Sequence, residues 1–95
     1  MKKSVLTLLL LLPPLLTFAA SRITKTYHQR PLSDVLIEID EAAPELTISF
    51  IYNKLEDYPV TCVIQNATPL EAIQQAVGFY PIKVSQSGKN VIVEP

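Results

Sequence analysis

A short pattern occurs twice in this chain, and its repetition constrains the fold more than any single residue does. Arg-Pro-Leu-Ser-Asp-Val occupies positions 30–35, and Thr-Pro-Leu-Glu-Ala-Ile occupies positions 68–73, which is 38 positions later. In each copy a Pro introduces a helical pattern, because its missing N–H would be unpaired in a first helical turn anyway. Apolar segments rich in β-branched residues flank each copy. The sequence therefore predicts a duplicated strand-helix-strand unit.

The first 19 residues have the composition of an export signal. Lys2 and Lys3 precede an apolar run at positions 5–16, and Thr17 and Ala19 supply the small side chains that cleavage requires. A membrane-spanning helix needs about 20 apolar residues, and two prolines interrupt this shorter run. We expect a signal peptide at residues 1–19 and an exported domain at residues 20–95, with no membrane span after cleavage. An uncleaved anchor is the alternative.

The exported part is small and acidic. A domain of about 75 residues buries only around 60% of the surface of its unfolded chain, so its stability is modest. Cys62 is the only cysteine and cannot form an internal disulfide. The full chain has 8 basic and 9 acidic residues, and removing Lys2 and Lys3 increases the acidic surplus. Because the remaining bases are scattered and phosphate binding needs clustered bases, we expect no nucleic-acid partner.

Residue periodicity gives the order of the elements. Apolar residues alternate with polar ones where strands are expected, and recur every three or four positions where helices are expected. Strands are expected at positions 23–29, 46–52, 60–64, 80–84 and 91–93, helices at 31–43 and between 68 and 78, a polar loop at 53–59 and a hairpin turn at 87–90. The predicted order is β-α-β-β-α-β-β, an α+β fold in which two helices pack on small sheets.

Both helices carry their own start and stop signals. The apolar stripe of the first consists of Leu32, Val35, Leu36, Ile39 and Ala43. Ser33 is expected on the solvated side of this helix, and Pro44 forbids its continuation. In the second helix, Thr68 and Glu71 form a capping box. Gly78 supplies the left-handed conformation that closes many helices.

These residues carry a resemblance to a known family. The matching features are Phe-Ile-Tyr-Asn at positions 50–53, Leu55, the strand at 60–64, Gln-Asn-Ala-Thr at 65–68, and Leu70, Glu71 and Ala72. Together they resemble the secretin and TonB N-terminus short domain, and the resemblance covers positions 23–94. In that family each helix also opens with a Leu followed by acidic residues. Lys25 departs from the family, which usually has an apolar side chain there.

The resemblance implies a place and a partner. Domains of this family lie in the periplasm, often at the front of an outer-membrane TonB-dependent receptor, where they pass a signal to the periplasmic domain of an anti-sigma regulator. We therefore expect a periplasmic signalling or adaptor domain, associated with the outer membrane when it is part of a longer receptor. The alternative is a free-standing periplasmic subunit that docks on a secretin-like or glycan-uptake outer-membrane complex.

The length of the chain also bears on its role. An outer-membrane barrel needs at least about eight strands of roughly ten residues each, and no such strands follow the domain in this sequence. We therefore expect this chain not to transport a substrate by itself.

The sequence offers little for catalysis or for a cofactor. Cys62 and His28 are the only thiol and the only imidazole, and Cys62 lies on the inward row of its strand, where Cys behaves as a small hydrophobe. His28 is expected to be a solvated turn residue. One His, one Cys and scattered carboxylates do not form a metal site. We expect no enzyme, metal or cofactor; a small hydrolase that uses Cys62 is the less favoured alternative.

Two short segments are candidates for protein binding. Glu56, Asp57 and Tyr58 lie in the polar loop, and Tyr58 is expected to be more exposed than Tyr52 and Tyr80, which end inward rows. A tyrosine offers a large rigid face at low entropic cost. The last strand, with Val91 and Val93, is expected to be a sheet edge at which a partner strand could add.

Overall fold

The computed structural model describes residues 21–95, so the predicted signal peptide lies outside the described residues. The elements are β1 (Ile23–Pro31), α2 (Leu32–Ala42), β2 (Thr47–Ser49), α3 (Tyr52–Leu55), β3 (Pro59–Ala67), α4 (Pro69–Val77), β4 (Lys83–Ser87) and β5 (Asn90–Glu94). The predicted α+β class is confirmed. A short helix, α3, is present in addition to the predicted elements.

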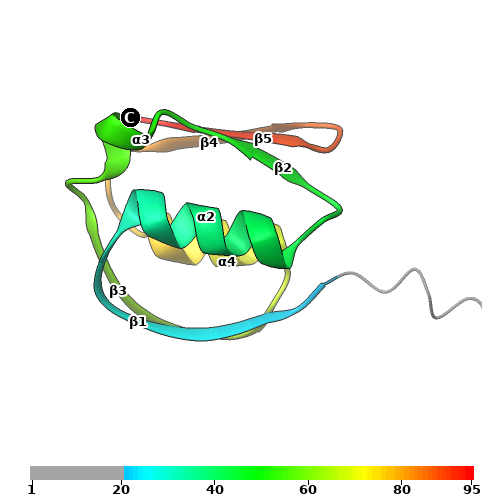
Figure 1. Cartoon of the computed structure of the whole chain (residues 1–95), viewed down its shortest axis with the longest axis horizontal. Helices are drawn as coiled ribbons and strands as arrows, with labels where there is room; N and C mark the ends of the chain where they lie inside the picture. Colours follow the sequence, from blue (N-terminus) through cyan, green and yellow to red (C-terminus); the bar gives the residue numbers. More distant parts are fainter. Residues whose placement is uncertain (1–20) are drawn as a thin grey trace, which may run out of the picture.

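The elements form three layers. Helices α2 and α4 lie side by side between a two-stranded sheet, β1 and β3, and a three-stranded sheet in the order β2-β5-β4 (Figure 1). The apolar stripes of both helices contribute buried side chains to one core, among them Leu36 and Ile39 from α2 and Ile73 from α4. Among residues 21–95, no helix is both long and apolar enough to cross a membrane.

The two halves of the duplicated sequence interlock through their strands. Strand β1 of the first half pairs antiparallel with β3 of the second, and β2 of the first half pairs parallel with β5 of the second. The antiparallel hairpin of β4 and β5 turns at Gly88 and Lys89, and Gly88 has φ 61°, a conformation that L side chains rarely adopt. Each sheet therefore contains strands from both halves.

Helix α4 begins and ends as its sequence predicts. The Thr68 side chain accepts a hydrogen bond from the backbone N–H of Glu71, and the Glu71 carboxylate accepts one from the N–H of Thr68, at 3.2 and 2.9 Å. Gly78, with φ 55°, ends the helix and donates its N–H to the carbonyl of Gln74. These contacts satisfy backbone groups that a helix leaves unpaired at its ends.

Helix α2 corrects one prediction. Its apolar stripe is buried as expected, and it stops before Pro44. Ser33, expected on the solvated side, is instead fully buried, and its Oγ donates a 2.6 Å hydrogen bond to the carbonyl of Tyr52. A buried hydroxyl is tolerated when it is hydrogen-bonded in this way.

Lys25 breaks the alternation of β1 for an identifiable reason. The strand buries Ile23 and Tyr27 and exposes Lys25, whose Nζ lies 3.3 Å from Oε1 of Glu38 on α2. Nη2 of Arg30 lies 2.6 Å from Oε2 of the same carboxylate. The two ion pairs therefore join β1 to α2.

The segment after β2 differs most from the prediction. The strand was expected to continue to position 52, but it stops at Ser49, and the residues expected to begin a loop form α3 instead. Leu55, at the end of α3, is fully buried. Burial of this side chain stabilises the short helix, because transfer of a Leu side chain from water to a protein core contributes about 1.5–3 kcal/mol to the free energy of folding. Tyr52, expected on an inward row, is exposed.

Candidate functional site

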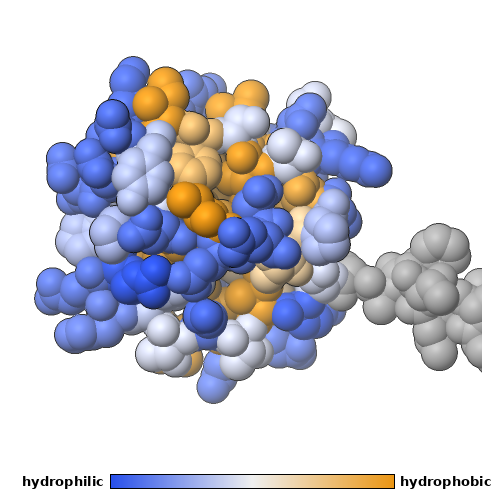
Figure 2. Space-filling model, in the orientation of Figure 1, coloured by the Kyte–Doolittle hydropathy of each residue, from blue (hydrophilic) through white to orange (hydrophobic). Residues whose placement is uncertain are grey.

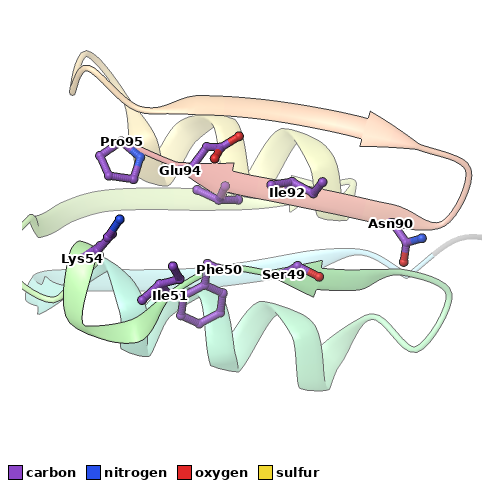
Figure 3. A pocket seen from close by; sticks show the side chains of 9 residues that line it. Ser49, Phe50, Ile51, Lys54, Asn90, Ile92, Glu94 and Pro95 are labelled. Carbon is purple, nitrogen blue, oxygen red and sulfur yellow. The ribbon is translucent and has the colours of Figure 1, made fainter.

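An open groove of about 580 Å³ separates the end of β2 and α3 from the carboxyl end of β5 (Figure 3). The pairing of β2 with β5 stops at Ser49 opposite Ile92, whereas β5 continues to Glu94. The chain after Ser49 leaves the sheet to form α3, so the last part of β5 has no neighbour from β2. The groove is lined by Ser49, Phe50, Ile51, Lys54, Asn90, Ile92, Val93, Glu94 and Pro95.

The surface of this groove is mainly apolar. Ile51 and Ile92 are 59% and 42% exposed, and they lie on opposite sides of the groove. Phe50 is half-buried and packs against the core, pointing away from β5 toward the helix layer (Figure 3). Lys54 rises from α3 toward Pro95, and Glu94 also lines the groove, so its mainly apolar surface carries one positive and one negative side chain.

The groove belongs to a larger apolar area. Figure 2 shows hydrophobic side chains gathered in the upper half of this face, over the region of β2, α3 and β5, and mostly hydrophilic side chains below them. Exposed apolar patches rimmed by polar residues are typical of sites that bind another molecule. The chemistry available here is the burial of apolar side chains, together with the opposite charges of Lys54 and Glu94.

The outer edge of β2 is not free for strand addition. Its central residue, Ile48, donates its backbone N–H to Oδ1 of Asp40 on α2, at 3.1 Å. The carboxylate of Asp40 therefore accepts the backbone hydrogen bond that an added strand would need from Ile48. Asp40 and Glu41 form a carboxylate pair in the sequence, but Asp40 makes this structural contact while Glu41 is exposed to solvent.

The prediction that β5 is a sheet edge is wrong. β5 is the central strand of its sheet, between β2 and β4. Val91 and Val93 are almost completely buried. The order of strands in a sheet depends on long-range pairing, which the local pattern of a strand does not encode. Val93 does line the groove, however, so one of the two predicted residues is at the candidate site.

The loop residues Glu56, Asp57 and Tyr58 do not line the groove. Glu56 and Asp57 are exposed, as expected. Tyr58 is half-buried, because its ring packs edge-on against Tyr80 with centroids 4.9 Å apart. Its carbonyl accepts the N–H of Leu32 at 2.8 Å. The expectation that Tyr58 is the most exposed of the three tyrosines is therefore wrong.

Tyr52 is the tyrosine that meets solvent. Its hydroxyl donates a 2.6 Å hydrogen bond to Oδ1 of Asp34. This hydrogen bond, with smaller contributions from burial and from nearby negative charge, raises the pKa of Tyr52. The contact fixes the start of α3 against α2, and so fixes one wall of the groove.

Sequence reasoning did not single out Ile51, Ile92 or Phe79 as exposed apolar residues. Ile51 and Ile92 were counted only as strand residues, although Ile51 interrupts the polar row of its segment, which is a signal that it faces a different surface. Phe79 is completely exposed. It follows the Gly78 helix stop and does not belong to the apolar stripe of α4, so its position in the sequence already separates it from the core.

Cys62 lies on β3 and His28 lies on β1. Cys62 is half-buried and packs against the core, and burial raises the pKa of its thiol. A raised pKa disfavours the thiolate that a nucleophile needs. His28 is exposed, and it lies within β1 instead of in the predicted turn. Within the range 21–95, no three His, Cys, Asp or Glu side chains come together in a way that could hold a metal ion.

Comparison with known proteins supports the fold. No family model matches the chain, and no curated protein matches it. Among solved structures, the chain is similar to part of the ferripyoverdine receptor of the outer membrane of Pseudomonas aeruginosa bound to ferripyoverdine, with a TM-score of 0.66 and 12% sequence identity. The match covers 80% of this chain and 10% of the receptor chain. At this identity the likeness concerns the fold, and the chain spans only about a tenth of the receptor.

Proposed function

We propose that this chain is a periplasmic docking domain of the kind found in TonB-dependent receptors, and that it binds the periplasmic domain of an anti-sigma regulator through the groove beside β5. The observation that carries the proposal is the fold match, which covers most of this chain and a tenth of an outer-membrane receptor. The role is non-catalytic.

The groove supplies the binding energy in this proposal. Covering Ile51 and Ile92 with partner side chains removes apolar surface from water, and full burial of one such side chain is worth about 1.5–3 kcal/mol. Lys54 attracts a carboxylate on the partner and sets its orientation, since charges at an interface contribute more to specificity than to affinity.

Docking alone does not transmit a signal. A partner that bound every state of a receptor equally would shift no equilibrium. Signalling through this domain therefore requires that receptor occupancy change the exposure of the groove, so that the regulator domain binds one state more tightly than the other.

Isothermal titration calorimetry tests the proposal. The chain recovered from the envelope of an expressing bacterium is titrated with the purified periplasmic domain of an anti-sigma regulator from the same bacterium. The double variant Ile51→Ser/Ile92→Ser is expected to bind at least about tenfold more weakly. Val63→Ser is the matched control, because Val63 is as exposed as Ile51, at 59%, but lies on β3 away from the groove.

Two results would contradict the proposal. One is the absence of measurable binding by the wild-type chain. The other is equal weakening by the groove variant and by Val63→Ser, which would place the contact elsewhere or indicate a loss of folding that is unrelated to docking. Circular dichroism of each variant separates these last two cases.

A further inference from the structure

Phe79 is the most exposed large hydrophobic residue of the described chain, and its relative solvent accessibility is 107%, which means full exposure. It lies between α4 and β4, at the end of the molecule where α3 also joins β3 (Figure 1). A single exposed hydrophobic residue is common on protein surfaces and needs no explanation by itself. What distinguishes Phe79 is the rigidity and the composition of its surroundings.

The neighbouring residue holds this loop in place. The ring of Tyr80 packs edge-on against Tyr58, and its hydroxyl donates a 2.5 Å hydrogen bond to the carbonyl of Pro59. The backbone N–H of Tyr80 donates to Val77, and its carbonyl accepts from Ile82. Phe79 is thus presented on a fixed backbone, and a partner that covers it does not have to order the loop. Such preorganisation removes part of the entropic cost of binding.

A hollow of about 310 Å³ lies beside Phe79. It is lined by residues of three elements and their ends: Gln29, Pro59, Val60, Thr61, the segment 75–78, Phe79 and Tyr80. None of these residues is charged. Depletion of charge together with an aromatic anchor is typical of the centre of a protein-protein interface, whereas polar residues form the rim.

Two exposed acidic residues lie close in the chain to this centre. Glu56 and Asp57 are exposed and directly precede Tyr58 and Pro59, which contact Tyr80. Asp57 and Glu56 are thus one and two residues away in the chain from the tyrosine that packs on Tyr80, the residue after Phe79. These carboxylates are complementary to a partner surface with Lys or Arg side chains.

We propose that Phe79 and the hollow beside it form a second docking surface, whose occupant is a different protein with an apolar socket for the phenyl ring and basic side chains facing Glu56 and Asp57. A second copy of this chain fits less well, because a two-fold contact would bring the same acidic rim to both sides. This inference does not rest on the proposed function, since the groove beside β5 is built from other residues.

Photo-crosslinking in the source bacterium tests the surface. The photoreactive residue p-benzoylphenylalanine replaces Phe79 in one strain and Val63 in a control strain, and the adducts are identified by mass spectrometry. We expect one specific protein adduct from position 79, none of the same mass from position 63, and loss of the adduct when Glu56→Lys/Asp57→Lys is added. Absence of an adduct at position 79, or the same adduct from both positions, would overturn the inference.

A binding measurement with the purified crosslinked protein completes the test. We expect Phe79→Ala and Glu56→Lys/Asp57→Lys each to weaken binding at least about tenfold, while Val63→Ala leaves it unchanged and salt weakens wild-type binding. Unchanged affinity of Phe79→Ala, or self-association through Phe79 in sedimentation experiments, would overturn the inference.

If the adduct is not the regulator, and the regulator does not bind the chain, the proposed function fails while this surface stands. If the regulator binds but Phe79→Ala does not weaken binding of the crosslinked protein, this second surface fails while the proposed function stands.

Discussion

Glu38 connects the first helix to the first strand through three side chains. Its carboxylate lies 3.3 Å from Nζ of Lys25 and 2.6 Å from Nη2 of Arg30, and it accepts a 3.2 Å hydrogen bond from Tyr27. Burial alone would raise the pKa of Glu38, but the hydrogen bonds from Arg30, Lys25 and Tyr27 outweigh it and lower the pKa. The folded chain therefore favours the ionised form of Glu38 more than the unfolded chain does.

This lowered pKa predicts how stability depends on pH. Because the folded-state pKa is below the ordinary value of 4.5, the contribution of Glu38 is complete above that value and is lost as the pH falls through the lowered pKa. Near pH 7 we expect Glu38→Gln to reduce the free energy of unfolding by about 1 kcal/mol. Urea denaturation of both proteins from pH 7 to pH 2 checks this. A difference that persists at the lowest pH would contradict the explanation.

The thiol of Cys62 gives a second residue-scale prediction. Because burial raises its pKa, we expect Cys62 to react slowly with a thiol reagent near neutral pH in the folded protein and at the rate of a free thiol in urea. Labelling kinetics followed by mass spectrometry measure both rates. Rapid modification of the folded protein would instead favour a reactive thiolate and the hydrolase alternative.

At the scale of elements, α3 depends on Leu55. This residue is fully buried, whereas Ile51, just before the same helix, is 59% exposed. Leu55→Ala removes buried atoms and leaves a cavity, so we expect a loss of about 2–5 kcal/mol. Ile51→Ala should cost little, because few of its atoms leave water on folding. Thermal unfolding of both variants measures the contrast. Similar losses from the two variants would mean that α3 is not held by Leu55.

Local sequence signals account for the helices, but not for the strand order or for α3. Caps, prolines and apolar stripes act within a few residues, so α2 and α4 and their buried faces follow from the sequence. The place of β5 in its sheet depends on pairing with β2 and β4, and no residue of β5 encodes that choice. The end of β2 depends on two tertiary contacts. One is the burial of Leu55 in the core, and the other is the hydrogen bond from the Ser33 hydroxyl to the carbonyl of Tyr52.

The candidate groove was unpredictable for the same reason. It exists because β5 continues beyond the point where β2 leaves the sheet, which is a property of the register between distant segments. Val93 was identified for a different reason, as part of an expected edge. Glu56 and Asp57 were correctly expected to be exposed, but their neighbour Tyr58 contacts Tyr80, a pairing across two loops that periodicity does not reveal.

At the scale of the whole molecule, the duplication produces one interlocked unit. Because β1 pairs with β3 and β2 with β5, both strands of the first half depend on the second half for their pairing, and β3 depends on the first. We therefore expect a single cooperative unfolding transition, as small single domains usually show. Coincident urea curves from far-ultraviolet circular dichroism and tyrosine fluorescence would confirm it. Two separated transitions would show that the halves fold independently.

The most direct test of the proposed docking role is an NMR titration of the isotope-labelled chain with the periplasmic domain of an anti-sigma regulator from the same bacterium. Binding through the groove predicts that the backbone amide signals of Ile51, Lys54, Ile92 and Glu94 shift, and that those of Thr26 and Val63 on the opposite sheet do not. Shifts confined to the β1 and β3 sheet, or no shifts at saturating regulator, would contradict the proposed role.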